Sequence, residues 1–319
     1  VGLHEGIVIS MADGYNKVTG DPAFVNVHVI AGTAQSAGQM YNSSRDGSAL
    51  VVTAGLLDNE RGDDEVLLGA RPGFDQKEVN RQFTKISWEC HDAAGIPAML
   101  RRAFKIATTA PGGPVYLALP DHVLEQKGVN GDIYPREGFI LPDAIPPNTD
   151  DVDEVARLLL DARSPALLLG DELSRANAQA EVFELAELLQ IPVADQGLSA
   201  FHNFPRQHPL FAGRHNTTGK DLVIYAGATD TSLGSDPADA TVVCIGLNTT
   251  AMGTVRPFDL AMVANVKLAL RAIIDSVKSQ ATGERIARIA SSRPEPRQTT
   301  PDIQRGRVGM SPIHPDELG

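Results

Sequence analysis

The apolar residues along the first 125 positions follow two alternating patterns, one typical of helices and one typical of buried strands. Residues 2–15 have helical spacing, with Ile7, Met11 and Tyr15 among the apolar positions, which predicts a helix that a sheet covers. The predicted strands are 24–30, 49–55 and 114–120, and the predicted helices between them are 33–44 and 92–110. Short apolar strands that alternate with helices predict a parallel sheet covered on both faces.

The same alternation resumes after a stretch rich in Gly, Pro and Asp at 126–150, which we interpret as a linker. The predicted strands are then 165–170, 191–195, 222–227 and 241–246, and the predicted helices are 151–162, 177–189 and 266–279. The chain is therefore expected to form two doubly wound parallel-sheet α/β domains, at 1–125 and 151–282. The sequence turns polar and rich in Arg and Pro near its end, where we expect a second linker at 283–319.

Composition excludes several classes of partner. The formal net charge of -12 over 319 residues argues against a surface for nucleic acid or for an anionic membrane. No apolar run approaches the about 20 residues that a membrane-spanning helix needs, and no secretory signal pattern opens the chain. The two cysteines, Cys90 and Cys244, lie far apart in the sequence, which favours a reducing, cytoplasmic setting. We expect no nucleic-acid partner and no membrane partner.

Two residues capable of acid–base chemistry stand in the first domain. Glu5 lies at the start of the first helix, where the helix dipole alone favours a carboxylate, although a partly buried carboxylate can also share a proton with a nitrogen base. His28 lies near the carboxyl end of a predicted strand, where open parallel sheets place ligands, but a single strand histidine is more often structural. The turn that follows, 31–38, contains Gly32 and Gly38, which allow close approach of backbone to a ligand or a neighbouring element. Position alone leaves both interpretations open.

Other candidate motifs do not support a site. The triplet Cys90-His91-Asp92 has no second pair at metal-ligand spacing. The glycine spacing in 31–38 differs from the dinucleotide fingerprint, and neither a phosphate-binding loop nor a nucleophile elbow occurs. The acidic cluster at 58–65 is interpreted as a solvated loop, with a cation site as the alternative. We expect no metal ligands in this chain.

The order of these motifs resembles the pyrimidine-binding domain of thiamine-diphosphate-dependent enzymes, the group of 2-oxo-acid decarboxylases and acetohydroxyacid synthases. The shared pattern is a helical Glu, Ala-x-Gly-Tyr, Thr-Gly-x-Pro, a strand, a glycine turn and a strand ending in Gly; here these are Glu5, Ala12, Gly14, Tyr15, Thr19, Gly20, Pro22, Gly32, Gly38 and Gly55. Residues 163–213 resemble the central domain of the group. Within the group, "ADGY", "PAFVNVH" and "GPVYLALP" are most similar to benzoylformate decarboxylases, whereas the pair His4-Glu5 is commoner in synthases of the acetolactate type.

The resemblance implies a cofactor, a substrate class and roles for five residues. Thiamine diphosphate is the implied cofactor and a 2-oxo acid the implied substrate. Glu5 is implied to hydrogen-bond the aminopyrimidine of the cofactor, and His28 to transfer a proton during catalysis. The turn residues Gly32, Thr33 and Gln35 are implied to contact the cofactor, with Gln35 standing where the family usually has Asn.

The family binds diphosphate and Mg²⁺ through Gly-Asp-Gly followed by Asn-Asn, and this chain contains neither motif. We therefore expect a diphosphate- and Mg²⁺-binding domain or subunit to act in trans, and a homo-oligomer, dimer or tetramer, to form through the pyrimidine domain. The chain alone is expected to be inactive. Two alternatives stay open, namely a carboligase similar to acetolactate synthase and a non-catalytic, regulatory form of the fold.

Overall fold

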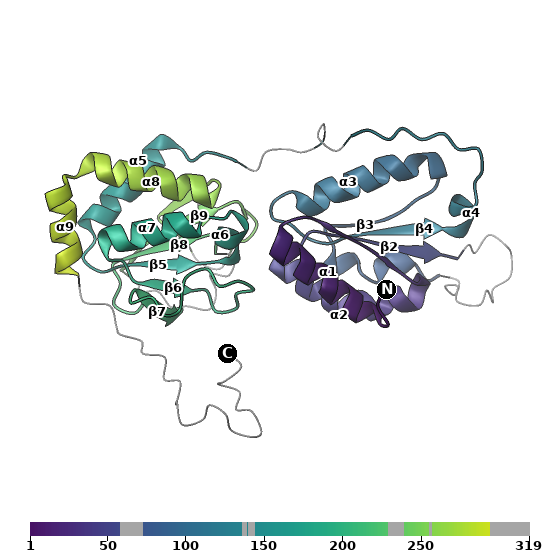
Figure 1. Cartoon of the computed structure of the whole chain (residues 1–319), viewed down its shortest axis with the longest axis horizontal. Coiled ribbons are helices and arrows are strands. Elements are labelled where there is room, and N and C mark those ends of the chain that lie inside the picture. Colours follow the sequence, from purple (N-terminus) through teal and green to yellow (C-terminus); the bar gives the residue numbers. More distant parts are fainter. Residues whose placement is uncertain (58–72, 136–138, 140–143, 229–238, 255–256, 294–319) are drawn as a thin grey trace, which may run out of the picture. The chain divides into compact units, whose positions relative to one another are not determined.

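The computed structural model describes residues 1–57, 73–135, 139, 144–228, 239–254 and 257–293. It divides into two compact units, Val1–Asp143 and Ala144–Gly319, and the division falls inside the expected first linker (Figure 1). The acidic cluster at 58–65 and the linker residues 294–319 lie outside the described residues.

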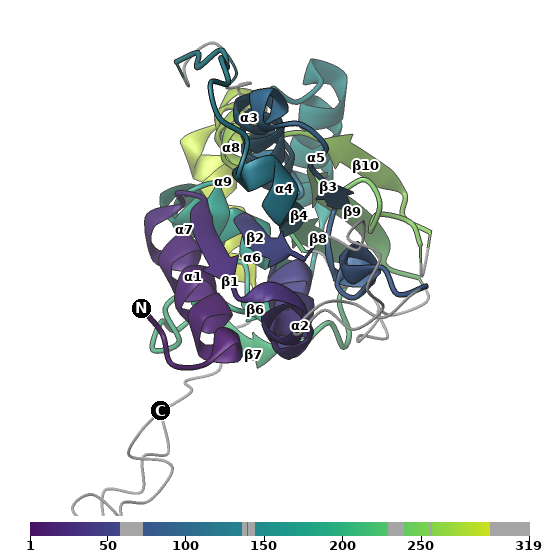
Figure 2. The same cartoon turned by 90° about the vertical axis from the view of Figure 1, so that its right-hand side faces the viewer.

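The first unit is a parallel sheet with helices on both faces. Its strands are β1 (Ala23–Val27), β2 (Leu50–Leu56), β3 (Ile86–Glu89) and β4 (Val115–Pro120), in the order β1-β2-β4-β3. Its α-helices are α1 (Glu5–Thr19), α2 (Val29–Asp46), α3 (Ile96–Thr108) and α4 (Asp121–Leu124), and its short 3₁₀ turns are η2 (Gln76–Glu78), η3 (Arg81–Phe83) and η4 (Ala93–Gly95). Helices α1 and α2 lie side by side under one face of the sheet, and α3 covers the other face (Figures 1 and 2).

Strand β1 ends sooner, and α2 begins sooner, than the sequence pattern predicts. The strand stops at Val27, and the chain reverses at His28 and Val29, where Val29 has a left-handed φ of 31°. The stretch 31–38 was expected to be a glycine turn, but it is helical and lies wholly within α2. The reversal at His28 and Val29 thus precedes both glycines: Gly32 is buried against Glu5, whereas Gly38 is exposed and a Cβ there would meet no neighbouring atom.

Helix α1 buries a different side from the one expected. Its buried residues are Ile9, Ala12 and Asn16, which face the sheet and α2. The prediction that Ile7, Met11 and Tyr15 are covered by the sheet is wrong for this chain, because each of these side chains is at least half exposed. Together with Val18 they form an exposed apolar stripe along one side of the helix, since their spacing of three or four residues repeats with the helical turn.

The second unit is a six-stranded parallel sheet. Its strands are β5 (Pro165–Leu169), β6 (Val193–Asp195), β7 (Phe211–Arg214), β8 (Leu222–Ala226), β9 (Thr241–Gly246) and β10 (Leu260–Val263), in the order β10-β9-β8-β5-β6-β7. Its helices are α5 (Thr149–Asp161), α6 (Asp171–Arg175), α7 (Gln179–Leu189), α8 (Val266–Gln280) and α9 (Gly283–Ser292). Apolar residues of α5, α7 and α8 join one face of the sheet in the larger core of the molecule.

The segment 283–292 was expected to begin the second linker, but it forms helix α9, which contacts α7. Ile286 is buried in the same core, so this helix belongs to the folded unit. Among the described residues, none of the helices combines the length and the apolar character that crossing a bilayer requires.

Candidate active site

Glu5 is the first residue of α1, next to a histidine that caps the helix. The His4 imidazole accepts a hydrogen bond at Nδ1 from the Gly6 amide, with 3.0 Å between the two nitrogens. This bond satisfies one of the free amides that every helix start presents. The Glu5 side chain is half-buried and lies in the first turn of α1, where the helix dipole interacts favourably with a carboxylate.

The Glu5 carboxylate rests on the backbone of α2 at Gly32. A Cβ atom built on Gly32 would lie 2.9 Å from Glu5 Oε1 and 3.0 Å from Glu5 Cγ, closer than side chains tolerate. Glycine is therefore required at position 32 for the carboxylate to occupy this place. Among the described residues, no hydrogen bond engages the Glu5 oxygens, so both can accept hydrogen bonds from the amino group or ring of a ligand. This open carboxylate, seated against bare backbone, fits the cofactor that the sequence implies.

His28 lies at the carboxyl end of β1, directly before α2. Its side chain is exposed and makes no capping bond to the helix that it precedes. Val29, the next residue, is a β-branched residue in the left-handed region, a strained conformation that tends to mark functional sites. Gly55, at the carboxyl end of β2, makes room for it, because a Cβ there would lie 3.2 Å from Val29 Cγ1. The structure thus places His28 at the same edge of the sheet as Gly55.

Thr33 and Gln35, the other two residues predicted to contact the cofactor, occupy opposite sides of α2. The Thr33 hydroxyl is fully buried, donates to the Val29 carbonyl at 2.7 Å and lies 2.9 Å from the Tyr116 hydroxyl. Thr33 as a whole is fully buried in this structure, so its contact with a cofactor stays a prediction from the resemblance. The Gln35 side chain is exposed, and among the described residues it makes no hydrogen bond with Glu5.

The Tyr116 hydroxyl is the centre of a buried polar network that sequence analysis did not identify. Gln76 Nε2 donates to Tyr116 Oη at 2.9 Å and to the Gly55 carbonyl at 2.8 Å. Burial raises the pKa of Tyr116, so its phenol stays neutral and can serve Thr33 and Gln76 together. The tyrosine in the otherwise apolar stretch "PVYLALP" was the available signal, since a buried phenol needs a partner.

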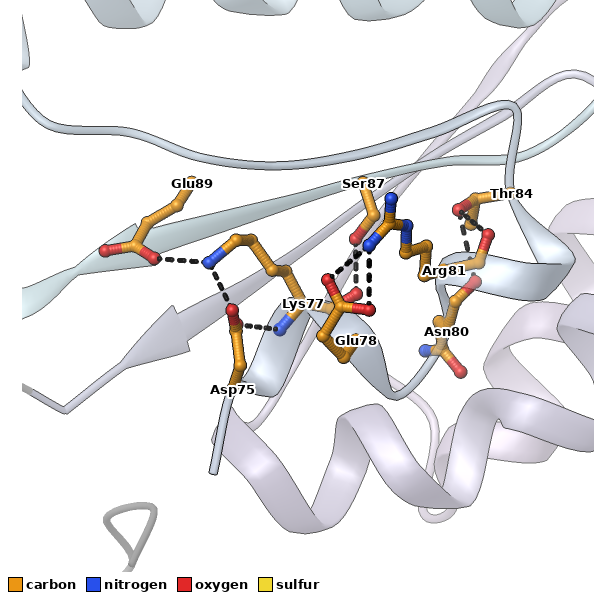
Figure 3. Close-up of polar contacts among 8 residues, drawn as sticks. All are labelled: Asp75, Lys77, Glu78, Asn80, Arg81, Thr84, Ser87 and Glu89. Atoms are coloured by element: carbon orange, nitrogen blue, oxygen red, sulfur yellow. Dashed lines mark hydrogen bonds and ion pairs between the residues drawn. The ribbon is translucent and has the colours of Figure 1, made fainter. Parts of the chain in front are cut away.

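Asn80 extends this network to the next turn of α2. Its Nδ2 donates to the Thr33 carbonyl and to Ser36 Oγ, each at 3.0 Å. Polar contacts with β3 hold the segment that carries Gln76 and Asn80 in place (Figure 3). Lys77 Nζ lies 2.5 Å from Asp75 Oδ2 and 3.4 Å from Glu89 Oε2, and Ser87 Oγ donates to the Lys77 carbonyl at 2.6 Å. The first turns of α2 are therefore held by buried donors whose own backbone is anchored to β3.

Tyr116→Phe is expected to destabilise the first unit by about 1–2 kcal/mol, because two buried groups lose one partner each while keeping another. Urea unfolding followed by fluorescence measures this directly, since Trp88 is the single tryptophan of the chain and lies in this unit. Tyr41→Phe is the matched control, because that side chain is half exposed. An equal effect of the two substitutions would contradict the assignment of Tyr116 to the centre of the network.

Within the described part of the chain, no three His, Cys, Asp or Glu side chains gather closely enough to hold a metal ion. The Mg²⁺ implied by the resemblance therefore has no ligand set assigned to it here.

Comparison with protein families matches both units. Residues 1–79 match the model of the thiamine pyrophosphate enzyme N-terminal TPP binding domain, and residues 152–273 match that of the thiamine pyrophosphate enzyme central domain. Together the two ranges make up more than half of the chain.

Individual relatives agree with the family models. The chain is 30% identical over 296 residues to benzoylformate decarboxylase of Pseudomonas aeruginosa, covering 88% of this chain and 55% of that protein. It is 25% identical over 297 residues to the acetolactate synthase large subunit of Buchnera aphidicola, covering 87% of this chain and 51% of that protein. The chain thus spans about half the length of these curated relatives.

Solved structures show the same fold. A putative thiamin diphosphate-dependent enzyme from Mycobacterium smegmatis matches with a TM-score of 0.76 and 26% identity, over 86% of this chain and 55% of that one. A thiamine diphosphate-dependent 4-hydroxybenzoylformate decarboxylase from Rhodococcus jostii matches with a TM-score of 0.73 and 28% identity, over 87% and 55%. With Glu5 on Gly32 in the first unit and both domain models matched, the chain belongs to the thiamine pyrophosphate enzyme family.

Proposed function

We propose that this chain provides the pyrimidine-binding and central domains of an enzyme that decarboxylates a 2-oxo acid without oxidation, using thiamine diphosphate. The observation that carries the proposal is the Glu5 carboxylate, which is free of protein partners among the described residues and rests on Gly32. The thiazolium of the cofactor, when bound, accepts the electron pair that decarboxylation releases. Similarity to benzoylformate decarboxylases supports decarboxylation over other reactions of the family.

The residues of this chain would hold the cofactor and move protons. Glu5 would accept a hydrogen bond from the aminopyrimidine and share its proton, a role for which a half-buried carboxylate at a helix start is suited. The bare backbone at Gly32 would let the ring approach α2. His28, exposed at the carboxyl end of β1, would exchange a proton with the reacting substrate. The Tyr116 network would keep the first turn of α2 in place while this happens.

The exposed stripe on α1 supports a homo-oligomer through this domain. The side chains of Ile7 and Met11 also line a shallow groove of about 490 Å³ between α1 and α2, together with His4, Gly6, Ser10 and Gln39. A contiguous exposed apolar surface of this kind marks a contact with another protein. We propose that a second copy covers it and that a diphosphate-binding domain or subunit supplies the Mg²⁺ site in trans.

Product analysis tests the proposed function. Together with the proposed diphosphate-binding domain or subunit, thiamine diphosphate and Mg²⁺, the chain is expected to convert benzoylformate or another 2-oxo acid to CO₂ and the aldehyde, whereas residues 1–319 alone are expected to give no product. The His28→Ala variant is expected to lose about 100-fold in decarboxylation, the lower range for a general acid–base residue. Acetolactate from pyruvate as the main product would replace the proposal by the carboligase. No product from any 2-oxo acid, in a protein that binds the cofactor, would favour the regulatory form.

A further inference from the structure

Val29, the residue between His28 and the rest of α2, determines how the chain turns out of β1. Its φ of 31° is in the left-handed region, which a β-branched residue keeps only where the surrounding structure enforces it. Val29 is buried, whereas His28 beside it is exposed, and the His28 carbonyl accepts a hydrogen bond from the Gly32 amide at 2.9 Å. The direction of the His28 side chain therefore depends on what holds Val29 in this conformation.

The side chain of Val29 is supported by the end of β2. A Cβ on Gly55 would lie 3.2 Å from Val29 Cγ1, so the valine rests on the backbone at Gly55. The pairing of β1 with β2 ends at Val27 and Ala54, and Gly55 lies one residue beyond that last pair. Gln76 Nε2 donates to the Gly55 carbonyl at 2.8 Å and thus holds β2 at the place where Val29 needs it.

The carbonyl of Val29 is held by a chain of hydroxyl groups that starts at the same nitrogen. Thr33 Oγ1 donates its one proton to the Val29 carbonyl at 2.7 Å. The Tyr116 hydroxyl, 2.9 Å from Thr33 Oγ1, must therefore donate to it, and in turn accepts from Gln76 Nε2 at 2.9 Å. The two protons of Gln76 Nε2 thus serve two routes, and both routes end on Val29.

We propose that Gln76 is a positioning residue for His28, an inference that rests on the proposed role of His28 in proton exchange. Through Gly55 and through the hydroxyl chain, Gln76 keeps Val29 left-handed and so fixes the direction of the His28 imidazole. Gln76 is only 3% exposed, so it acts through Val29 and not on a substrate. Proton exchange depends on such placement, because a displacement of about 1 Å can cost about 100-fold in rate.

NMR on the intact chain tests the structural part of this proposal. Gln76→Met keeps the length of the side chain and removes both donors. We expect the backbone ¹³C shifts of Val29 to move away from left-handed values and the ring resonances of His28 to shift with them. Thr33→Val is the second variant, for the case that Gln76→Met does not fold. It removes the last step of the hydroxyl chain and spares the bond to Gly55, so we expect smaller shifts of the same resonances.

Asn16→Leu is the matched control in the same unit. Asn16 is buried, its Nδ2 donates to the Asp21 carbonyl at 2.9 Å, and its Oδ1 accepts from the Ala49 amide at 3.1 Å. These bonds lie at the amino ends of β1 and β2, at the other edge of the sheet from His28. The control loses a comparable pair of hydrogen bonds, yet it should leave the resonances of Val29 and His28 at their wild-type values.

A double-mutant cycle tests whether Gln76 acts through His28. The chain is assayed with its diphosphate-binding domain or subunit, thiamine diphosphate and Mg²⁺. Gln76→Met is expected to lower kcat for decarboxylation at least about tenfold when His28 is present, but less than about twofold in the His28→Ala background. A residue that only stabilises the fold would give the same loss in both backgrounds.

Unchanged resonances of Val29 and His28 in Gln76→Met, or equal kinetic losses in the two backgrounds, would overturn the proposal. A wild-type assembly that decarboxylates no 2-oxo acid would instead contradict the proposed function. The resonances alone would then decide whether Gln76 fixes the direction of His28.

Discussion

Glu5→Gln is expected to lower turnover by the cofactor-loaded protein, assembled with its diphosphate-binding domain or subunit, at least about 100-fold, because glutamine keeps the shape of the side chain but cannot exchange a proton. The measurement is kcat at saturating 2-oxo acid, thiamine diphosphate and Mg²⁺, with unfolding of the first unit followed through Trp88 as a control for folding. Stability should change little, since the half-buried Glu5 has no hydrogen-bond partner among the described residues to lose.

A matched variant separates the catalytic role of Glu5 from its interaction with the helix dipole. Glu284 also lies in the first turn of a helix, α9, and its side chain is exposed. Glu284→Gln therefore removes the same favourable interaction with a helix start, worth about 0.3–1 kcal/mol, and should leave kcat unchanged. Equal kinetic effects of the two substitutions would show that Glu5 is only a helix-start charge.

Gly32→Ala tests the position of the carboxylate without removing it. The new methyl group would meet Glu5 Oε1 at 2.9 Å, and the flexible glutamate side chain can move away at little cost. Alanine also stabilises a helix interior by about 1 kcal/mol relative to glycine. Turnover should therefore fall while the first unit becomes equally or more stable. Unchanged turnover would show that the contact between Glu5 and Gly32 has no part in the chemistry.

The sequence predicted the central strands of both units and missed three of the four edge strands. Parallel strands covered on both faces are continuous apolar runs, which is why β2, β4, β5, β8 and β9 were recognisable. The missed strands β3, β7 and β10 are each four residues long and lie at sheet edges, where apolar runs are not required. On α1, periodicity showed an apolar side but could not distinguish a side that faces the sheet from one left exposed.

The sequence predicted only those site residues that belong to one continuous sequence motif. Glu5, Gly32 and His28 stand within one run of sequence that resembles the family, and the packing of α1 on α2 then brings Glu5 to Gly32. The Tyr116 network joins residues up to 83 positions apart, and Glu172 meets Leu247 across 75 positions. No local pattern pairs such residues, because each partner follows from the order of strands in its sheet.

Arg293 is a further residue of this kind, and its replacement by Ala is expected to destabilise the second unit by about 3 kcal/mol. It stands in a stretch whose Arg and Pro content predicted a linker, yet it is buried at the end of α9. Its guanidinium donates to the Leu189 carbonyl, and Nη2 donates to the Leu159 carbonyl at 2.9 Å. These carbonyls belong to the last turns of α7 and α5, where helices lack internal partners. The positively charged Arg293 side chain thus caps the carboxyl ends of two helices, and the dipoles of both helices favour a cation there.

Burial lowers the pKa of Arg293 to about 10, so the side chain remains charged at neutral pH. Arg293→Ala leaves two buried carbonyls without their donor, and Arg293→Lys should recover less than half of the loss, because an ammonium cannot span both helix ends as the planar guanidinium does. Arg285→Ala is the matched control: Arg285 lies on the same helix and forms an exposed ion pair with Asp161, worth less than about 1 kcal/mol.

The measurement is urea unfolding followed by far-ultraviolet circular dichroism, with Trp88 fluorescence recorded on the same samples. Trp88 belongs to the first unit and Arg293 to the second, so Arg293→Ala should shift the circular-dichroism transition and leave the fluorescence transition in place. A loss below about 1 kcal/mol would show that water replaces the guanidinium at both helix ends. An equal shift of the two transitions would instead mean that the units unfold together, with α9 stabilising both.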